Sequence, residues 1–233
     1  MDGLTGKRYL LAVLCLAGLS LTGCSEFAEL PTWVPFAGEI ADKLPGVTTP
    51  SQRLAAIQKL SDNAAWKRPP ERRKIAEQLT AAFYVEEDEI IRAEIVRAMG
   101  KFPGPGTDAV MRAAIDDKEP EVRLAACEAW GKRGGAEATT LLSARLTGDL
   151  DKDVRLAAAR GLGDVKDPAA IAALGGVLDD ADPAMQYYAV AALQKNTGKD
   201  LGNDVNQWRQ YVKGETPKPA RPVSIAERLR QMF

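Results

Sequence analysis

The sequence contains no histidine. This absence excludes catalysis by a Ser-His-Asp or Cys-His arrangement, metalloenzymes of the HExxH type and most transition-metal sites. Large aromatic side chains are also few, since five Phe, five Tyr and four Trp are spread over 233 residues. A chain of this length can bury a sizeable core, and here that core must be built mainly from Ala, Leu, Val and Ile. Small aliphatic side chains in such numbers favour closely packed helices.

Cysteine and excess charge are scarce as well. Cys15 and Cys24 fall in the N-terminal segment, so Cys127 is alone in the body of the chain and the folded domain cannot contain an internal disulfide. Basic and acidic residues are almost balanced, with 31 Lys and Arg against 32 Asp and Glu. Without a basic excess there is little to neutralise a phosphate backbone, and we expect no nucleic-acid binding.

Motifs for cofactors and metals are missing too. No phosphate-binding loop, dinucleotide fingerprint or nucleophile elbow is present, and the glycine-rich residues 100–106 (GKFPGPG) predict a turn between helices. Residues 149–153 (DLDKD) resemble the start of a calcium loop, but Val154 replaces the required glycine and Arg160 the bidentate glutamate. A solvated turn followed by a helix cap is the simpler interpretation. We therefore expect no catalytic residues, no metal or other cofactor, no small-molecule substrate and no enzymatic activity.

The first residues are typical of a targeting signal. Lys7 and Arg8 precede an apolar run over residues 9–21, which is shorter than the roughly 20 apolar residues that a membrane-spanning helix needs. The run ends in Leu21-Thr22-Gly23-Cys24, which resembles the bacterial lipobox, in which the cysteine thiol accepts diacylglycerol. This resemblance predicts a lipoprotein signal peptide over residues 1–23 and lipidation at Cys24. The alternative is an ordinary signal peptide or anchor that happens to contain a cysteine.

Lipidation would anchor the mature chain to a membrane, because several acyl chains on one residue hold a protein there durably. By the same resemblance, the protein would face the periplasm or another extracytoplasmic space in the cell envelope. Ser25, in place of an aspartate that retains lipoproteins at the inner membrane, favours the outer membrane. Residues 24–50 contain four prolines and predict a tether between the lipidated cysteine and the folded domain.

The body of the chain repeats itself. Four segments of fourteen residues align over 88–101, 119–132, 151–164 and 182–195. Their fifth position holds Arg92, Arg123, Arg155 and finally Gln186, at spacings of 31 or 32 residues, and a degenerate earlier copy places Arg53 in the same column. The gap from Arg53 to Arg92 is longer and indicates an insertion near residues 68–70. A regular period of this size is typical of a solenoid.

Each column of the repeat predicts a structural role. An acidic residue four positions before the arginine suits a helix N-terminus, where it meets free N–H groups and the positive end of the helix dipole; these residues are Asp88, Glu119, Asp151 and Asp182. Gly100, Gly131 and Gly163 predict left-handed turns that end the helices. Second apolar segments over 108–115, 136–146, 168–178 and 204–212 complete the units. We therefore predict an all-α, right-handed α-solenoid of about five helix-turn-helix repeats over residues 51–213.

The motifs at 151–163 (DKDVRLAAARGLG) and 119–131 (EPEVRLAACEAWG) resemble HEAT-like repeats of the phycocyanobilin-lyase type. The resemblance implies a structural ladder between neighbouring units, made by the acidic and arginine columns: Asp88, Arg92, Glu119, Arg123, Asp151, Arg155 and Asp182. It also implies that Trp208 packs in a terminal repeat. Function is less specified, because such repeats serve many proteins. A bilin-lyase-like activity conflicts with an export signal, and the histidine-dependent HEAT-repeat hydroxylases are excluded by composition.

The C-terminal residues 214–233 combine a second proline-rich linker with a short amphipathic helix. The helix would begin with a capping box at Ser224 and Glu227, and its apolar positions are Ile225, Leu229, Met232 and Phe233. About ten residues are too few for a stable isolated helix, so we expect this candidate docking helix to pack in cis on the solenoid or in trans on a partner or membrane.

These observations predict a membrane-anchored scaffold or adaptor in the cell envelope that binds a protein or peptide partner of unknown identity. The alternatives are a passive structural envelope lipoprotein and, less in keeping with the sequence, a bilin-lyase-like subunit.

Overall fold

The computed structural model describes residues 48–62 and 64–217. Every described residue belongs to the unit Gly46–Phe233. Within the described residues the fold is an all-α solenoid, as predicted, with ten α-helices, one short 3-10 helix and no strand. The elements are α2 (Pro50–Ser61), η2 (Ala64–Trp66), α3 (Pro69–Val85), α4 (Glu89–Met99), α5 (Pro105–Ala114), α6 (Pro120–Arg133), α7 (Gly135–Gly148), α8 (Lys152–Asp164), α9 (Pro168–Gly176), α10 (Pro183–Thr197) and α11 (Val205–Val212).

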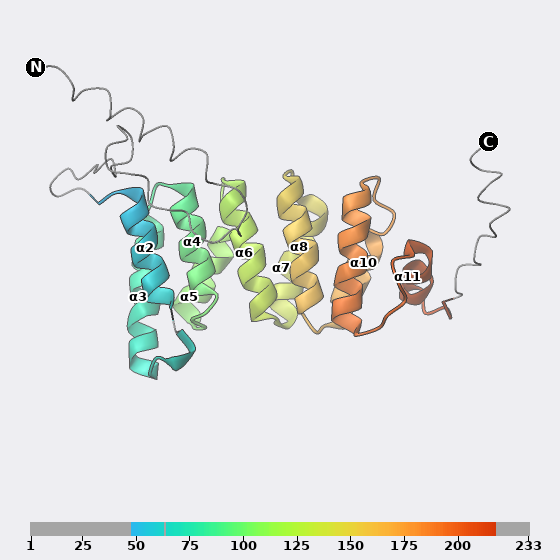
Figure 1. Ribbon diagram of the computed structural model, residues 1–233, viewed down its shortest axis with the longest axis horizontal. Helices are drawn as coiled ribbons and strands as arrows, with labels where there is room; N and C mark the ends of the chain where they lie inside the picture. The colour runs from blue at the N-terminus through green and yellow to red at the C-terminus, as the bar shows by residue number, and fades with distance from the viewer. Residues whose placement is uncertain (1–47, 63, 218–233) are drawn as a thin grey trace, which may run out of the picture. The chain divides into compact units, whose positions relative to one another are not determined.

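The helices form two layers. Helices α2, α4, α6, α8 and α10 stand side by side in one row, and α3, α5, α7 and α9 form the second row behind them (Figure 1). Helix α11 follows α9 at the C-terminal end. Consecutive helices of the first row contact each other more extensively than those of the second, so the first row is the more tightly packed layer.

Aspartate side chains begin most first-row helices, as the repeat predicts. The carboxylate of Asp88 accepts the N–H groups of Ile90 and Ile91 at 3.0 and 3.1 Å, and that of Asp151 caps α8 in the same way. The carboxylate of Asp182 caps α10 by accepting one N–H group, that of Ala184. Glu119 occupies the N-cap of α6 without a capping hydrogen bond. These caps satisfy N–H groups that have no partner within the helix.

Of the three repeat glycines only Gly100 follows the end of a helix, as the C-cap of α4, and none forms a left-handed turn, so that prediction was wrong. Gly131 lies inside α6 and Gly163 inside α8, while Gly100 has a right-handed φ of −53°. A Cβ atom on Gly131 would lie 2.6 Å from the Cα of Gly161, and one on Gly163 would lie 2.9 Å from the Cα of Ala192. The absence of a side chain is therefore needed for close contact between consecutive first-row helices.

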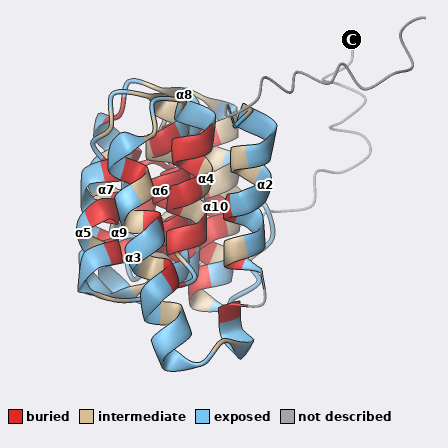
Figure 2. Cartoon of the chain, turned by 90° about the vertical axis from the view of Figure 1, so that its left-hand side faces the viewer, coloured by how far each residue is buried: buried red, intermediate tan, exposed pale blue. Residues whose placement is uncertain are grey.

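The hydrophobic core lies between the two layers, as Figure 2 shows. It is rich in alanine and branched aliphatic side chains, and its fully buried aromatic residues are Trp130, Trp208 and Phe102. The indole N–H of Trp130 donates to the carbonyl oxygen of Met111 at 3.1 Å. Cys127 is fully buried in this core, and burial raises the pKa of its thiol to about 12.

Candidate functional site

A ladder of arginines joins consecutive repeats. Arg123 on α6 donates from Nε and Nη2 to both carboxylate oxygens of Asp149, each at 2.9 Å. Asp149 lies in the loop before α8, the next first-row helix. The same contact recurs between Arg53 and Glu86, Arg92 and Asp117, and Arg155 and Asp180. Every arginine of the column is therefore engaged by the neighbouring repeat.

The acidic partners are not the residues that the sequence analysis singled out. Each arginine pairs with a carboxylate of the next repeat that lies two positions before the N-cap residue of that repeat's first-row helix. The predicted partners Asp88, Asp151 and Asp182 cap their own helices instead. Both functions are encoded in a short acidic pattern before α4, α6, α8 and α10: residues 86–88 (EED), 117–119 (DKE), 149–151 (DLD) and 180–182 (DAD). The acidic pattern is visible in the sequence. Which of its carboxylates pairs with the arginine and which caps the helix depends on the position of the neighbouring helix.

The carboxylate of Asp149 is buried and held in its ionised form by the ladder. Its side chain is only 1% exposed, and burial alone would raise its pKa. The hydrogen bonds from Arg123 and from the N–H of Asp151, together with the charges of Arg123 and Arg145, hold the pKa of this carboxyl below its usual range. Arg123 also donates from Nη1 to the carbonyl oxygens of Asp117 and Lys118. These arginines are thus occupied by the fold and have a structural role.

The ladder ends at Gln186 for a physical reason. Its Nε2 donates to the carbonyl oxygen of Asp180 at 2.7 Å, which parallels the contact that Arg123 makes with its own loop. Among residues 48–217 no first-row helix follows α10, so no further loop carboxylate is there to receive a charge. Because Gln186 is neutral, it needs no carboxylate partner at this position, whereas an arginine would be left unpaired.

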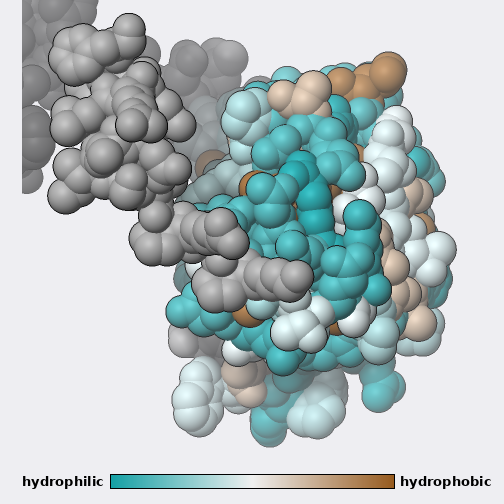
Figure 3. Space-filling view, turned by 90° about the vertical axis from the view of Figure 1, so that its right-hand side faces the viewer, coloured by the Kyte–Doolittle hydropathy of each residue, from teal (hydrophilic) through white to brown (hydrophobic). Residues whose placement is uncertain are grey.

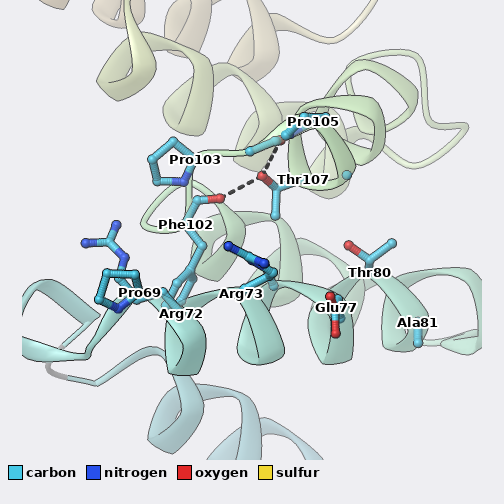
Figure 4. Close-up of a pocket in the computed structure, with 13 residues that line it drawn as sticks. Pro69, Arg72, Arg73, Glu77, Thr80, Ala81, Phe102, Pro103, Pro105 and Thr107 are labelled. Carbon is cyan, nitrogen blue, oxygen red and sulfur yellow. Dashed lines mark hydrogen bonds between the residues drawn. The ribbon is translucent and has the colours of Figure 1, made fainter.

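A groove lies between α3 and the connection from α4 to α5 (Figure 4), with a volume of about 850 Å³. Its first wall is a stripe of α3 at helical spacing, from Pro69 to Ala81, and its second wall is formed by residues 102–107. Helix α3 has 17 residues and α5 only 10. The difference leaves part of α3 without a neighbouring helix to cover it.

The second wall is fixed by its own chemistry. Pro103 and Pro105 restrict the backbone, and the hydroxyl of Thr107 lies 2.6 Å from the carbonyl oxygen of Phe102 and 2.9 Å from that of Gly104. The Phe102 side chain is buried beneath this wall. The groove therefore has a preformed wall rather than a pliable glycine loop.

The groove is apolar with a basic edge. Pro69, Ala76, Pro103 and Pro105 supply apolar surface, while the polar side chains that line it are Arg72, Arg73, Glu77, Thr80 and Thr107. Arg72 is partly engaged, since its Nη2 donates to the carbonyl oxygen of Lys101 at 3.1 Å and its guanidinium lies over the Phe102 ring. Arg73 is exposed and forms no ion pair with a described residue.

A smaller hollow of about 430 Å³ adjoins the groove and shares Arg72 with it. Lys101, Ser61 and the segment Ala64–Trp66 line this hollow, which is created by the insertion between α2 and α3. The Trp66 side chain there is 88% exposed. The sequence analysis noted the insertion and the GKFPGPG turn separately, and nothing in the sequence indicated that they meet.

The remaining predicted sites lie outside the described residues. These are Leu21, Thr22, Gly23 and Cys24 of the lipobox and Ile225, Leu229, Met232 and Phe233 of the candidate docking helix. Within residues 48–62 and 64–217, no helix combines the length and the apolarity needed to cross a bilayer. In the same part of the chain, no three His, Cys, Asp or Glu side chains converge as metal ligands would.

Comparison with known families agrees with this architecture. The model of HEAT repeats matches residues 76–150 and 139–201, which together make up more than half of the chain. The chain belongs to the HEAT-repeat family. Proteins of this kind present extended surfaces to which other proteins bind.

Among solved structures, this HEAT-repeat protein is similar to human deoxyhypusine hydroxylase in complex with glycerol. The two share 21% sequence identity with a TM-score of 0.47, over 53% of this chain and 44% of that one. Less than half of the hydroxylase thus has a counterpart here. No curated protein matches the sequence.

Proposed function

We propose that this HEAT-repeat protein is a lipid-anchored adaptor of the cell envelope, which binds a segment of a partner protein and has no catalytic activity of its own. The observation that carries the proposal is the groove between α3 and the α4–α5 connection, together with the adjoining hollow at Trp66. Both lie where the regular repeat is interrupted, and insertions in repeat proteins often form the binding face.

The exposed surface near the groove supports an adaptor over a passive structural protein. Trp66 is 88% exposed, and Tyr84 and Val85 at the end of α3 are 65% and 78% exposed. Apolar surface that a protein keeps in contact with water commonly marks an interaction site. Tryptophan is also among the residues that contribute most to binding at protein interfaces.

The anchor rests on the sequence alone. The charged start, the short apolar run and the Leu21–Cys24 motif support export and lipidation at Cys24, and the prolines of residues 24–50 support a tether. An adaptor of this design would hold its partner near the membrane, the outer membrane being favoured by Ser25. The predicted C-terminal helix at residues 224–233 would supply a second contact.

The proposal is tested by in-cell crosslinking and affinity capture of the full-length chain, beside Cys24→Ser and a version lacking residues 218–233. We expect one dominant partner in the membrane fraction, and transfer of Cys24→Ser from the detergent phase to the aqueous phase. Anchorage without any partner above background would favour the passive structural alternative. Unchanged partitioning of Cys24→Ser would contradict the anchor.

A further inference from the structure

We propose that the groove between α3 and the α4–α5 connection binds an extended acidic peptide segment of another protein, with at least one apolar side chain seated against the prolines. This inference rests on the proposed adaptor function and names the site and the chemistry of the partner. The groove is open at the surface, and its volume of about 850 Å³ is large enough for several residues of an extended chain.

Charge around the groove selects an acidic segment. Four basic residues line or adjoin the two hollows and form no ion pair with any described residue: Lys67, Arg72, Arg73 and Lys101. Among the described residues, Glu77 supplies the only carboxylate that lines the groove. The whole chain is nearly neutral, with 31 basic and 32 acidic residues, so this basic concentration is local.

The basic side chains elsewhere on the solenoid are more often neutralised. On the first-row surface, Arg97 pairs with Glu128 at 3.0 Å, and Lys195 pairs with Asp164 at 2.5 Å. Arg73, by contrast, lies between the two walls of the groove in Figure 4 without such a partner. A carboxylate entering the groove would find guanidinium donors that the fold does not use.

The backbone adds to this preference. Helix α5 begins at Pro105 without a side-chain cap, and the N–H of Gly106 has no acceptor among the described residues. The positive end of the α5 dipole therefore faces the groove that Gly106 lines. Guanidinium groups on one wall and a free N–H on the other both favour a negatively charged ligand.

Shape and charge disfavour other occupants. A flat bilayer cannot enter a groove between a helix and a loop, whereas an extended chain can. The chain's own residues 218–233 carry Lys218, Arg221, Arg228 and Arg230 against Glu227, so they match the groove poorly in charge. The end of the solenoid at α11 is largely hydrophilic in Figure 3.

The test is a selection of random dodecapeptides displayed on phage against the full-length chain, with a parallel selection against Gly106→Leu. A Cβ at position 106 would lie 3.9 Å from Oγ1 of Thr80 on the opposite wall, which is an ordinary contact, and the rest of a leucine side chain would take up space in the groove. We expect enriched peptides with a clear excess of Asp and Glu and at least one large apolar residue, and no such enrichment with Gly106→Leu.

Affinities of the selected peptides are then measured by fluorescence polarisation. Arg73→Glu should weaken binding by about tenfold or more, which corresponds to about 1.4 kcal/mol. Lys74→Glu is the matched control, because it makes the same change of charge one residue away at a position that does not line the groove. Equal weakening by both variants, enriched peptides without acidic bias, or enrichment that survives Gly106→Leu would each overturn the inference.

Two further measurements separate the alternatives. Co-sedimentation with vesicles of phosphatidylcholine, with and without anionic phosphatidylglycerol, tests a membrane as occupant, and light scattering tests a second copy. Sensitivity of either to Arg73→Glu but not to Lys74→Glu would replace the peptide with that occupant. If a partner captured in cells binds Gly106→Leu and Arg73→Glu as well as it binds the wild type, the adaptor function stands and this site is refuted. Peptide binding at the groove without any cellular partner would support this site and contradict the adaptor function.

Discussion

The Cα atom of Gly161 in α8 lies only 2.6 Å from the position that a Cβ atom on Gly131 of α6 would occupy. The pair is one instance of a contact that recurs along the first row, with Gly163 and Ala192 in the next repeat. Backbone against backbone at this distance leaves no room for a methyl group. The close packing of the first row therefore depends on these two positions.

We predict that Gly131→Ala destabilises the protein by about 1–3 kcal/mol, because a methyl group at this contact forces α6 and α8 apart. Gly148→Ala at the end of α7 is the control, since a Cβ there meets nothing within 4 Å and alanine favours the helix. Urea unfolding followed by circular dichroism measures both. Equal stability of the two variants would show that the contact is not needed.

The ladder gives a prediction at Asp149. Asp149→Asn should lower the free energy of unfolding by about 3 kcal/mol at neutral pH, because it leaves the largely buried Arg123 without its carboxylate. Asp116→Asn is the comparison, since Asp116 also pairs with Arg145 but its side chain is 67% exposed. A loss as small as that of Asp116→Asn would mean that the ladder contributes little to stability.

The same residue predicts a pH dependence. The pKa of Asp149 is lower in the folded protein than its ordinary value, so its ionised form stabilises the fold at pH values above about 4. This contribution is lost as the pH falls through the lower pKa of the folded state. The difference in stability between the wild type and Asp149→Asn should therefore shrink in acid, as measured by urea unfolding at a series of pH values. A constant difference down to pH 2 would contradict it.

Cys127 should be unreactive in the native protein. Its thiol is fully buried and its pKa is raised to about 12, so almost no thiolate is present at pH 8. In a variant with Cys15→Ser and Cys24→Ser, we expect Ellman's reagent to label Cys127 only as fast as the repeat opens, and rapidly in urea. Labelling of the native protein at the rate of a free thiol would show that the core around α6 opens readily.

Comparing a buried tryptophan with an exposed one tests whether Trp208 stabilises the C-terminal end of the solenoid. Trp208 is fully buried and its indole N–H donates to the carbonyl oxygen of Gly202 at 2.9 Å, whereas Trp66 is 88% exposed. Trp208→Ala should cost about 3–5 kcal/mol of stability, and Trp66→Ala less than about 0.5 kcal/mol. Thermal unfolding of both variants checks the contrast, and similar melting temperatures would refute the capping role of Trp208.

The sequence predicted the helices well because their signals are local. The second apolar segments expected over 168–178 and 204–212 correspond to Pro168–Gly176 and Val205–Val212 in the structure. Aspartate caps and proline at the first helical position act within a few residues, so they are visible in one sequence.

The errors have a common physical origin. Gly131 suits a helix end as well as a close contact, and only the position of Gly161, thirty residues later, decides between them. The choice of Asp149 over Asp151 as ladder partner likewise depends on where Arg123 lies. The groove joins residues of α3 to residues 102–107, and its existence depends on the unequal lengths of two helices.

Each ladder arginine contacts the chain that precedes its own helix and the loop of the following repeat, and within the described residues no ladder contact extends further. The stability of such an array is the sum of its units and of their nearest-neighbour interfaces. Hydrogen exchange should therefore be uneven, with opening that begins at the ends and advances one repeat at a time. A ligand bridging α3 and the α4–α5 connection would slow amide exchange in α2 to α5 and leave α8 and α10 unchanged. The two ends of this protein can thus be loosened or held independently, although one continuous core joins them.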